Sequence, residues 1–168
     1  MLAQVDFLNA KVSLAETLHA IRPELVNEPL LEWSEARHPV LWLHYAPQGK
    51  SVVPLSIRLN ADSNKILVIS GPNAGGKSVC LKTVALLQYM LQCGLLVPVA
   101  EQSRAGFFDQ LMIDIGDEQS IQDELSTYSS HLRNMRAFLR QADERTLILI
   151  DEMGTGTEPL MGGAIAEA

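Results

Sequence analysis

The stretch that decides the fold of this chain is Gly71-Pro72-Asn73-Ala74-Gly75-Gly76-Lys77-Ser78. It satisfies G-x-x-x-x-G-K-[ST], the Walker A or P-loop pattern of nucleotide-binding proteins. Its glycines let backbone N–H groups turn inward around phosphate oxygens, and the N-terminus of a following helix adds donors that favour anions. We expect Lys77 to contact the β and γ phosphates and the Ser78 hydroxyl to ligate Mg²⁺. A plain glycine turn between a strand and a helix is the alternative, and it leaves Lys77 unexplained.

The residues on both sides of this stretch predict the strand and the helix that a P-loop requires. The run Ile66-Leu67-Val68-Ile69 is continuously apolar, as expected of a strand that is buried on both faces. Residues 78–92 predict a helix that is apolar on most sides and therefore buried, with Gly94 at its C-terminal cap. The motif thus has the local context that its mechanism demands.

Further elements follow toward the C-terminus. Residues 111–115 and 146–150 predict strands, the second of them a fully apolar one. Between them, residues 131–142 predict an amphipathic helix with Leu132, Met135 and Leu139 on one stripe. Strands that alternate with helices predict an α/β fold with a mostly parallel sheet flanked by helices.

The N-terminal part of the chain predicts a different arrangement. Apolar residues recur at spacings of three and four over the first twenty residues, which predicts a helix that Pro23 ends. We expect a short strand around residues 40–44 and a half-buried strand over residues 53–59, followed by a turn over residues 60–64. These strands suggest an antiparallel β part beside the parallel sheet.

The charge of the chain limits what it can bind by itself. Among its 168 residues, 13 are Lys or Arg and 20 are Asp or Glu, which gives a formal net charge of −7. This balance argues against a free-standing nucleic-acid binder, although it does not exclude a local basic patch. Arg133, Arg136 and Arg140 form one basic stripe on the helix expected over residues 131–142. A solvated helix face and a contact to DNA or RNA are both open as interpretations.

Cysteine content and hydropathy favour a cytoplasmic protein. Cys80 and Cys93 are too few for a disulfide framework, so we interpret them as reduced thiols packed as small apolar groups. The first ten residues show neither a basic start nor an apolar run, so we expect no signal peptide. Since no apolar stretch reaches the length needed to span a bilayer, we expect no membrane partner.

A second candidate site follows the strand expected over residues 146–150, at Asp151-Glu152. In a P-loop fold, a carboxylate at this place holds Mg²⁺, which is the Walker B role that we expect for Asp151. The adjacent Glu152 is the natural general base for the attacking water. Taken alone, an acidic pair that begins a loop is the alternative. Residues 153–159 follow as either a simple turn or a loop that lines an ATP-bridged dimer, and their spacing does not choose between the two.

Three stretches together resemble the ATPase domain of MutS-type proteins. They are GPNAGGKS at residues 71–78, GDEQSIQDELSTYSSH at 116–131 and LILIDEMGTGTEP at 147–159. The second and third are most similar to the second MutS type, which lacks mismatch-reading domains and carries a C-terminal small MutS-related nuclease domain. Ala36-Arg37-His38-Pro39 also resembles the beginning of this domain in the family. The resemblance covers most of residues 1–168.

The resemblance implies roles for residues that spacing alone does not single out. Gln119 falls where a residue of the family senses the γ-phosphate or the metal. Ser126 and Thr127 belong to the signature stretch that would reach the nucleotide of the opposite subunit. From the residues alone, Ser126 and Thr127 are equally candidates for helix N-caps, with Ser129 and Ser130 as rivals.

The resemblance also implies a domain plan. Residues 1–22 would be the end of a lever helix, and residues 23–168 a partial P-loop NTPase domain of the ATP-binding-cassette-like, MutS type. Residues 162–168 look like the opening of a helix without a stop signal, so we expect a chain truncated at its C-terminus. The family's switch histidine lies on a later strand, and none of the four histidines is placed to be it: His19, His38, His44 and His131.

The function that the resemblance implies is ATP hydrolysis between the two subunits of a homodimer. The ATP cycle would drive a nucleic-acid clamp in DNA repair or recombination control. The family has been linked both to branched DNA intermediates of recombination and to rescue of stalled ribosomes, and the sequence does not choose between these partners. We expect the isolated chain to be weakly active or inactive as an ATPase, because half of each composite site comes from the partner.

Two alternatives remain open at this point. In the first, ATP is a conformational ligand that closes a dimer with little hydrolysis. In the second, the chain is a different P-loop enzyme, such as a small-molecule kinase or a GTPase. The sequence has no N-K-x-D motif for guanine, and the acidic pair fits water activation better than transfer to a metabolite.

Overall fold

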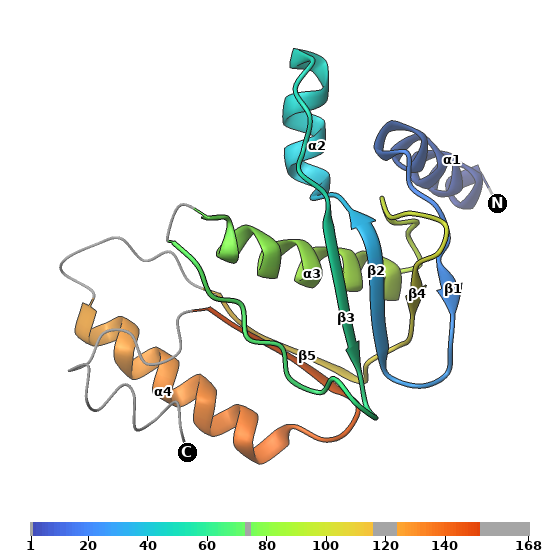
Figure 1. The fold of residues 1–168 in the computed structure, drawn as a ribbon. Helices are drawn as coiled ribbons and strands as arrows, with labels where there is room; N and C mark the ends of the chain where they lie inside the picture. The colour runs from blue at the N-terminus through green and yellow to red at the C-terminus, as the bar shows by residue number, and fades with distance from the viewer. Residues whose placement is uncertain (1, 73–74, 116–123, 152–168) are drawn as a thin grey trace. The chain divides into compact units, whose positions relative to one another are not determined.

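A computed structural model gives the fold of the chain and describes residues 2–72, 75–115 and 124–151 (Figure 1). The chain divides into two compact units, Met1–Phe108 and Asp109–Ala168. Each unit is described by itself below. Together they confirm the mixed α/β class, with helices and both parallel and antiparallel strand pairs.

The first unit is built on a four-stranded sheet with the strand order β1-β4-β2-β3 (Figure 1). The strands are β1 (Glu24–Leu25), β2 (Leu30–Ala36), β3 (Leu55–Asn60) and β4 (Arg104–Ala105). β2 pairs antiparallel with both β3 and β4, whereas β1 pairs parallel with β4. The prediction of an antiparallel N-terminal β part is therefore confirmed, as is the turn after β3, where Asn60 Oδ1 accepts from the N–H groups of Ser63 and Asn64.

The core of this unit lies between β2 and helix α3 (Lys77–Gln92), which crosses one face of the sheet (Figure 1). Leu31 and Trp33 of β2 and Val84 and Leu87 of α3 are buried. α3 ends at Gln92 with Cys93 as its C-cap, and the expected Gly94 follows with a left-handed φ of 71° that turns the chain away from the helix. The N–H groups of residues 94 and 95 then bond back to the carbonyls of residues 91 and 90. The buried side of α3 therefore covers one face of the four-stranded sheet (Figure 1).

Helix α1 (Leu2–Leu18) confirms the expected N-terminal helix but ends earlier than Pro23. His19 takes a left-handed conformation with φ 50°. Its N–H donates to Glu16 O, and the N–H of Ala20 donates to Ala15 O, which completes a Schellman ending. The helix is thus closed by its own backbone before the proline is reached.

The strand expected around residues 40–44 is wrong, because helix α2 (Pro39–Tyr45) occupies this segment. His38 is its N-cap, and the ring Nδ1 accepts from the N–H of Leu41 at 3.4 Å. Pro39 sits at the first helical position, where its fixed φ suits a helix and no N–H is needed. A short 3-10 turn, Ala46–Gln48, follows. The apolar residues of this segment gave no period that separates a strand from a helix.

The strand expected over residues 66–69 is also absent from the structure. Ile66 and Val68 are 84% and 82% exposed, and none of the described strands pairs with this run. An apolar run becomes a buried strand only where neighbouring strands bond to its edges and other elements cover its faces. The sequence shows the apolar character, but it does not show whether those neighbours are present.

The second unit confirms a parallel strand pair. β5 (Gln110–Asp114) and β6 (Thr146–Ile150) run parallel, with Asp114 opposite Ile150. Helix α4 (Glu124–Gln141) lies between them in the chain and begins seven residues before the expected start at residue 131. A larger parallel sheet flanked by helices stays a prediction, as do the domain bounds at residues 22 and 23.

The apolar stripe expected on α4 is confirmed only in part, because Met135 is half-buried but the two leucines are exposed. Leu139 is 89% exposed and Leu132 is 40% exposed. Among residues 131–141, the less exposed side chains are those of His131, Asn134, Met135, Ala137 and Phe138. Two of these are polar, because the strand beneath ends in a carboxylate that they contact. The apolar pattern alone therefore matched the less exposed face only at Met135.

The cysteine interpretation holds in part. Both thiols are free, and Cys80 is half-buried in α3, where burial raises its pKa. Cys93 is exposed, because it takes the C-cap position of α3 and does not pack in the core. Among the helices that the structure describes, none combines the length and the apolar character needed to cross a membrane.

Candidate functional site

Two glycines shape the loop that precedes α3. Gly71 has φ 153° and Gly76 has φ 81°, which are conformations that favour glycine over residues with a side chain. The N–H of Gly75 donates to Pro72 O at 2.8 Å, so the described part of the loop turns back on itself. Asn73 and Ala74 lie outside the described residues. The glycine pattern of the motif therefore has a backbone reason, independent of any ligand.

Helix α3 begins directly where the loop ends. Gly76 is its N-cap and brings no side chain that caps the helix. The first helical hydrogen bond runs from the N–H of Cys80 to Gly76 O at 2.9 Å. The N–H groups of a first helical turn have no acceptor inside the helix, and with the positive end of the helix dipole they favour an anion. The end of α3 that faces the loop thus favours a negatively charged group.

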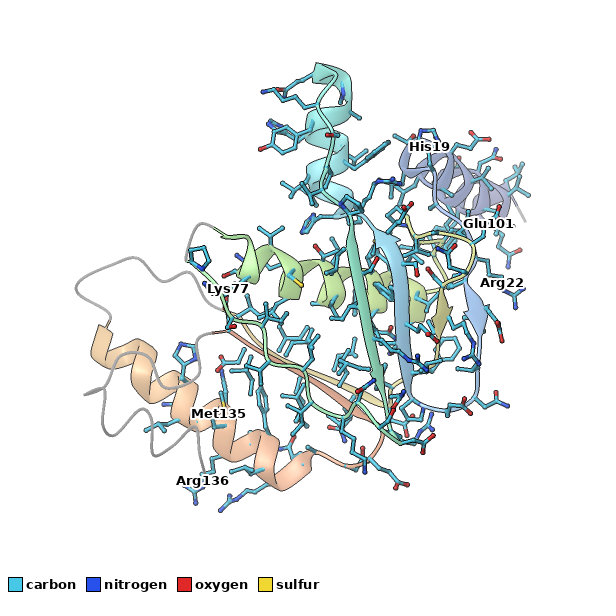
Figure 2. All side chains as sticks on the ribbon, in the orientation of Figure 1. His19, Arg22, Lys77, Glu101, Met135 and Arg136 are labelled. Carbon is cyan, nitrogen blue, oxygen red and sulfur yellow. The ribbon has the colours of Figure 1, made fainter. Side chains whose placement is uncertain are left out.

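The ammonium group of Lys77 is hydrogen-bonded to the beginning of the loop that precedes α3. Its Nζ donates to Gly71 O at 2.9 Å and to Pro72 O at 3.1 Å, and Figure 2 shows the residue at the beginning of α3. Ser78, the expected metal ligand, is the next residue of the helix and is half-buried. The structure thus brings Lys77 together with the first two residues of the motif.

The expected Walker B carboxylate belongs to the second unit. Asp151 directly follows β6, is 7% exposed, and donates its N–H to Asp114 O at 2.9 Å. That bond extends the parallel ladder by one residue, so Asp151 stands at the carboxyl end of the strand pair. Catalytic and binding residues of parallel sheets gather at this end of the strands. The expected base Glu152 and the loop at residues 153–159 lie outside the described residues.

The signature residues fall on a helix. Ser126 and Thr127 lie in the first turn of α4, which begins at Glu124. The alternative interpretation as N-caps is therefore wrong for both, and also for Ser129 and Ser130, because a cap residue precedes the helix. Gln119 lies outside the described part of the chain. The roles that the resemblance implies for these residues stay predictions.

One polar cluster was missed by the sequence analysis. The carboxylate of Asp114, only 6% exposed, accepts from His131 Nδ1 at 2.7 Å and from Asn134 Nδ2 at 2.9 Å. We call Asp114, His131 and Asn134 the Asp114 network. The available signal was a carboxylate next to the end of a predicted strand, followed by two polar residues spaced three apart on the next helix. Only the pairing of that helix with the strand shows that the three residues meet.

The Ala36-Arg37-His38-Pro39 stretch connects β2 to α2. Burial, and further the positive charge of Lys82, lowers the pKa of the His38 imidazole, against the effect of its own backbone hydrogen bond. The N–H of Arg37 donates to Pro98 O at 3.0 Å. In this structure the stretch caps and anchors α2.

The basic stripe of α4 is exposed, which is compatible with both interpretations, a solvated face and a nucleic-acid contact. Arg133, Arg136 and Arg140 are all exposed, and Figure 2 shows Arg136 pointing away from the strand pair. Within residues 2–72, 75–115 and 124–151, no group of three or more His, Cys, Asp or Glu residues is arranged to hold a metal ion.

Comparison with known proteins places these features in a family. The family described as MutS domain V matches residues 67–168. Curated proteins named Endonuclease MutS2 are similar over the chain. That of Levilactobacillus brevis is 46% identical over 100% of this chain and 20% of its own length. That of Lactobacillus helveticus is 46% identical over 98% and 20%, and that of Carboxydothermus hydrogenoformans is 42% identical over 100% and 21%.

The chain thus spans about a fifth of the length of the curated relatives it matches. The domain match covers more than half of the chain and includes the P-loop, α3, β5, α4 and β6. The chain therefore belongs to the MutS family and is of the MutS2 type.

Proposed function

We propose that this chain binds Mg-ATP through residues 71–78 and forms the ATP-hydrolysing part of a MutS2-type protein. The observation that carries the proposal is the position of Lys77. Its ammonium group lies on the carbonyls of Gly71 and Pro72, beside the uncapped N-terminus of α3. A cation and a helix N-terminus on one glycine-shaped loop are what a triphosphate requires.

Phosphate binding would use donors that already lie at the loop, namely the Lys77 ammonium group and the N–H groups at the start of α3. The ammonium of Lys77 would turn from neutral carbonyls to anionic phosphate oxygens, and hydrogen bonds between charged groups are the stronger kind. The amides of the first turn of α3 would add donors without side-chain rearrangement. The conformations of Gly71 and Gly76 would keep the loop in the shape that lets its backbone approach the ligand.

The residue types expected as ligands are ones that suit a magnesium ion. Mg²⁺ that arrives with a nucleotide takes one or two protein oxygens and completes its shell with phosphate and water. We expect the Ser78 hydroxyl and the Asp151 carboxylate as protein ligands from their motifs, and a buried carboxylate such as that of Asp151 favours a cation partner. When bound, the ion neutralises charge on the β and γ phosphates.

The residues that would carry out hydrolysis are those to which the family resemblance assigns a catalytic or sensing role. Glu152 would orient and deprotonate the attacking water, Gln119 would sense the γ-phosphate or the metal, and Ser126 and Thr127 would reach the nucleotide of a second subunit. α4 supports this last role in one respect, because both residues lie at its beginning. The protein would therefore act as a homodimer.

The biological role that family membership supports is DNA repair or recombination control, with a DNA partner. In this proposal the ATP cycle moves a nucleic-acid clamp formed by parts outside this chain. Branched DNA is the proposed target, and a ribosome is the alternative. The exposed arginines of α4 stand on a chain of net charge −7, so the main nucleic-acid contact is assigned to those other parts.

The test is single-turnover hydrolysis by the full-length protein that carries this chain. Glu152→Gln is expected to keep Mg-ATP binding within threefold and to lower the hydrolysis rate at least a hundredfold. Its matched control is Glu144→Gln, a change of the same kind just before β6, which is expected to leave the rate within twofold. Undiminished hydrolysis in Glu152→Gln would overturn the assigned base. Tight binding without hydrolysis in the unsubstituted protein would favour an ATP-gated binding module.

A further inference from the structure

The Asp114 network joins a strand end to a helix. Asp114 is the last residue of β5, and its two carboxylate oxygens accept separate hydrogen bonds. Oδ2 accepts from His131 Nδ1 at 2.7 Å and Oδ1 accepts from Asn134 Nδ2 at 2.9 Å. Because an ionised carboxylate only accepts, His131 must carry its proton on Nδ1. Both oxygens of one buried side chain are thus engaged by a single helix.

The spacing of the donors makes this attachment specific. His131 and Asn134 are three residues apart on α4, so they lie on one face about one turn from each other. At the opposite end of the strand, Gln110 Nε2 donates to Gln141 O at 3.2 Å. α4 is therefore bonded to β5 near both ends of the strand. The Asp114 end is the buried one, whereas the Gln110 bond is exposed.

The same residue also holds the backbone of the expected metal ligand. The main-chain oxygen of Asp114 accepts the N–H of Asp151 at 2.9 Å. Asp114 thus fixes α4 with its side chain and Asp151 with its main chain. Thr127 of the signature stretch lies four residues before His131, which is about 6 Å along a helix axis. The network therefore stands between two groups that the proposed hydrolysis uses.

We propose that Asp114 is a positioning residue for ATP hydrolysis. It sets the position of the beginning of α4 relative to Asp151, and so relates the signature residues to the metal ligand. This inference rests on the proposed function, since positioning has meaning only if the site turns ATP over. Removal of the carboxylate would leave two half-buried donors without their acceptor, and the helix would lose its attachment at this end.

The kinetic test uses the full-length protein that carries this chain. Asp114→Ala is expected to lower kcat at least tenfold, with KM for ATP within threefold, because the loop that binds phosphate is unchanged. Asp114→Asn keeps an acceptor for Asn134 and offers its N–H₂ to the other tautomer of His131, so it is expected to recover most of the lost kcat. Asp109→Ala removes a carboxylate from the opposite end of β5, and we expect kcat and KM within twofold of the unsubstituted protein. A kcat for Asp114→Ala within twofold, or a loss that Asp114→Asn does not relieve, would overturn the inference.

A second readout separates this inference from the proposed function. Amide hydrogen exchange is followed at Asp151 and over residues 131–141 in the same variants. Asp114→Ala is expected to speed exchange at both places at least tenfold, and Asp109→Ala at neither. If the unsubstituted protein hydrolyses no ATP, the proposed function fails, and unchanged exchange in Asp114→Ala would separately overturn the attachment of α4. If Asp114→Ala does not fold, Asn134→Ala removes one donor from the helix side and carries the same expectations at about threefold.

Discussion

The ammonium group of Lys11 on α1 donates to the carbonyl oxygens of Cys93 at 3.3 Å and Gly94 at 3.2 Å, at the C-terminal end of α3. A cation at this end complements the helix dipole and satisfies carbonyls that have no partner inside the helix. Ile21 and Val97 add a pair of backbone bonds just beyond both helices, with N···O distances of 2.9 and 3.0 Å. The helix that begins at the P-loop is therefore attached at its other end to α1.

Lys11→Ala is expected to lower the free energy of unfolding of the chain by about 0.5 kcal/mol, because an exposed cation at a helix end contributes on this scale. Urea denaturation followed by circular dichroism measures the change. Lys65→Ala, an exposed lysine for which the structure shows no helix-end contact, is the control and should leave the midpoint unchanged. Equal midpoints for Lys11→Ala and the unsubstituted chain would contradict the role of this contact.

Gly106→Ala is expected to destabilise the chain by about 3 kcal/mol or more, since the backbone itself would have to move. A Cβ at residue 106 would collide with the backbone of Glu28, while the N–H of Gly106 is bonded to Leu30 O at 2.7 Å. Gly49→Ala is the matched control. Gly49 has φ 68° and open space around its Cβ position, so only the left-handed conformation is penalised, by about 1 kcal/mol. Denaturation midpoints in urea compare the two, and a smaller effect at residue 106 would be the contrary result.

The stability of the chain is expected to fall in mild acid through His38. Burial lowers its pKa below the ordinary value of 6.5, so the unfolded state binds the proton more tightly than the folded state. The contribution of His38 is complete above pH 6.5 and is lost as the pH drops toward the lowered pKa. Protonation of Nδ1 would also remove the acceptor that caps α2.

An NMR titration of the His38 ring checks this directly. The midpoint should lie below 6.5 in the unsubstituted chain and move upward in Lys82→Ala, because the lysine charge contributes to the lowering. Lys65→Ala should leave it in place. A midpoint at or above 6.5 would disprove the account of this residue.

The two thiols are expected to differ in reactivity. Cys93 is exposed, whereas Cys80 is half-buried and its pKa is raised by burial, which lowers the fraction of reactive thiolate. Iodoacetamide at pH 8 should modify Cys93 at least ten times faster than Cys80. Mass spectrometry of Cys80→Ser and Cys93→Ser measures each thiol alone, and equal rates would be the opposite outcome.

Local chemistry accounts for the features that the sequence predicted well. Gly94 turns the chain away from the end of α3 because glycine alone adopts a left-handed φ without strain, and this requirement is visible in one residue. The parallel pair of β5 and β6 follows from two apolar runs with a helix between them, which is a property of the chain order. The glycine positions of the P-loop follow in the same way, since Gly71 and Gly76 both have positive φ.

Tertiary contacts account for features that the sequence analysis did not predict. His19 ends α1 in a conformation that a histidine seldom adopts, and its ring lies edge-on against Trp42 at 5.5 Å between centroids. The apolar stripe of α4 matched the less exposed face only at Met135, while Asp114 contacts that face through His131 and Asn134. For α4 the deciding partner lies far away in the sequence, whereas at His19 the helix backbone closes the ending and the ring contact with Trp42 accompanies it.

The central claim of this account is that Lys77 and its loop bind the triphosphate of Mg-ATP. Calorimetric titration of Mg-ATP into the chain tests it most directly, with Lys77→Ala as the variant and Lys65→Ala as the control. We predict binding by the unsubstituted chain and by Lys65→Ala, and a loss of at least about tenfold in affinity for Lys77→Ala, as expected for removal of a charged hydrogen bond. Equal affinity in Lys77→Ala, or no binding by the unsubstituted chain, would contradict the claim.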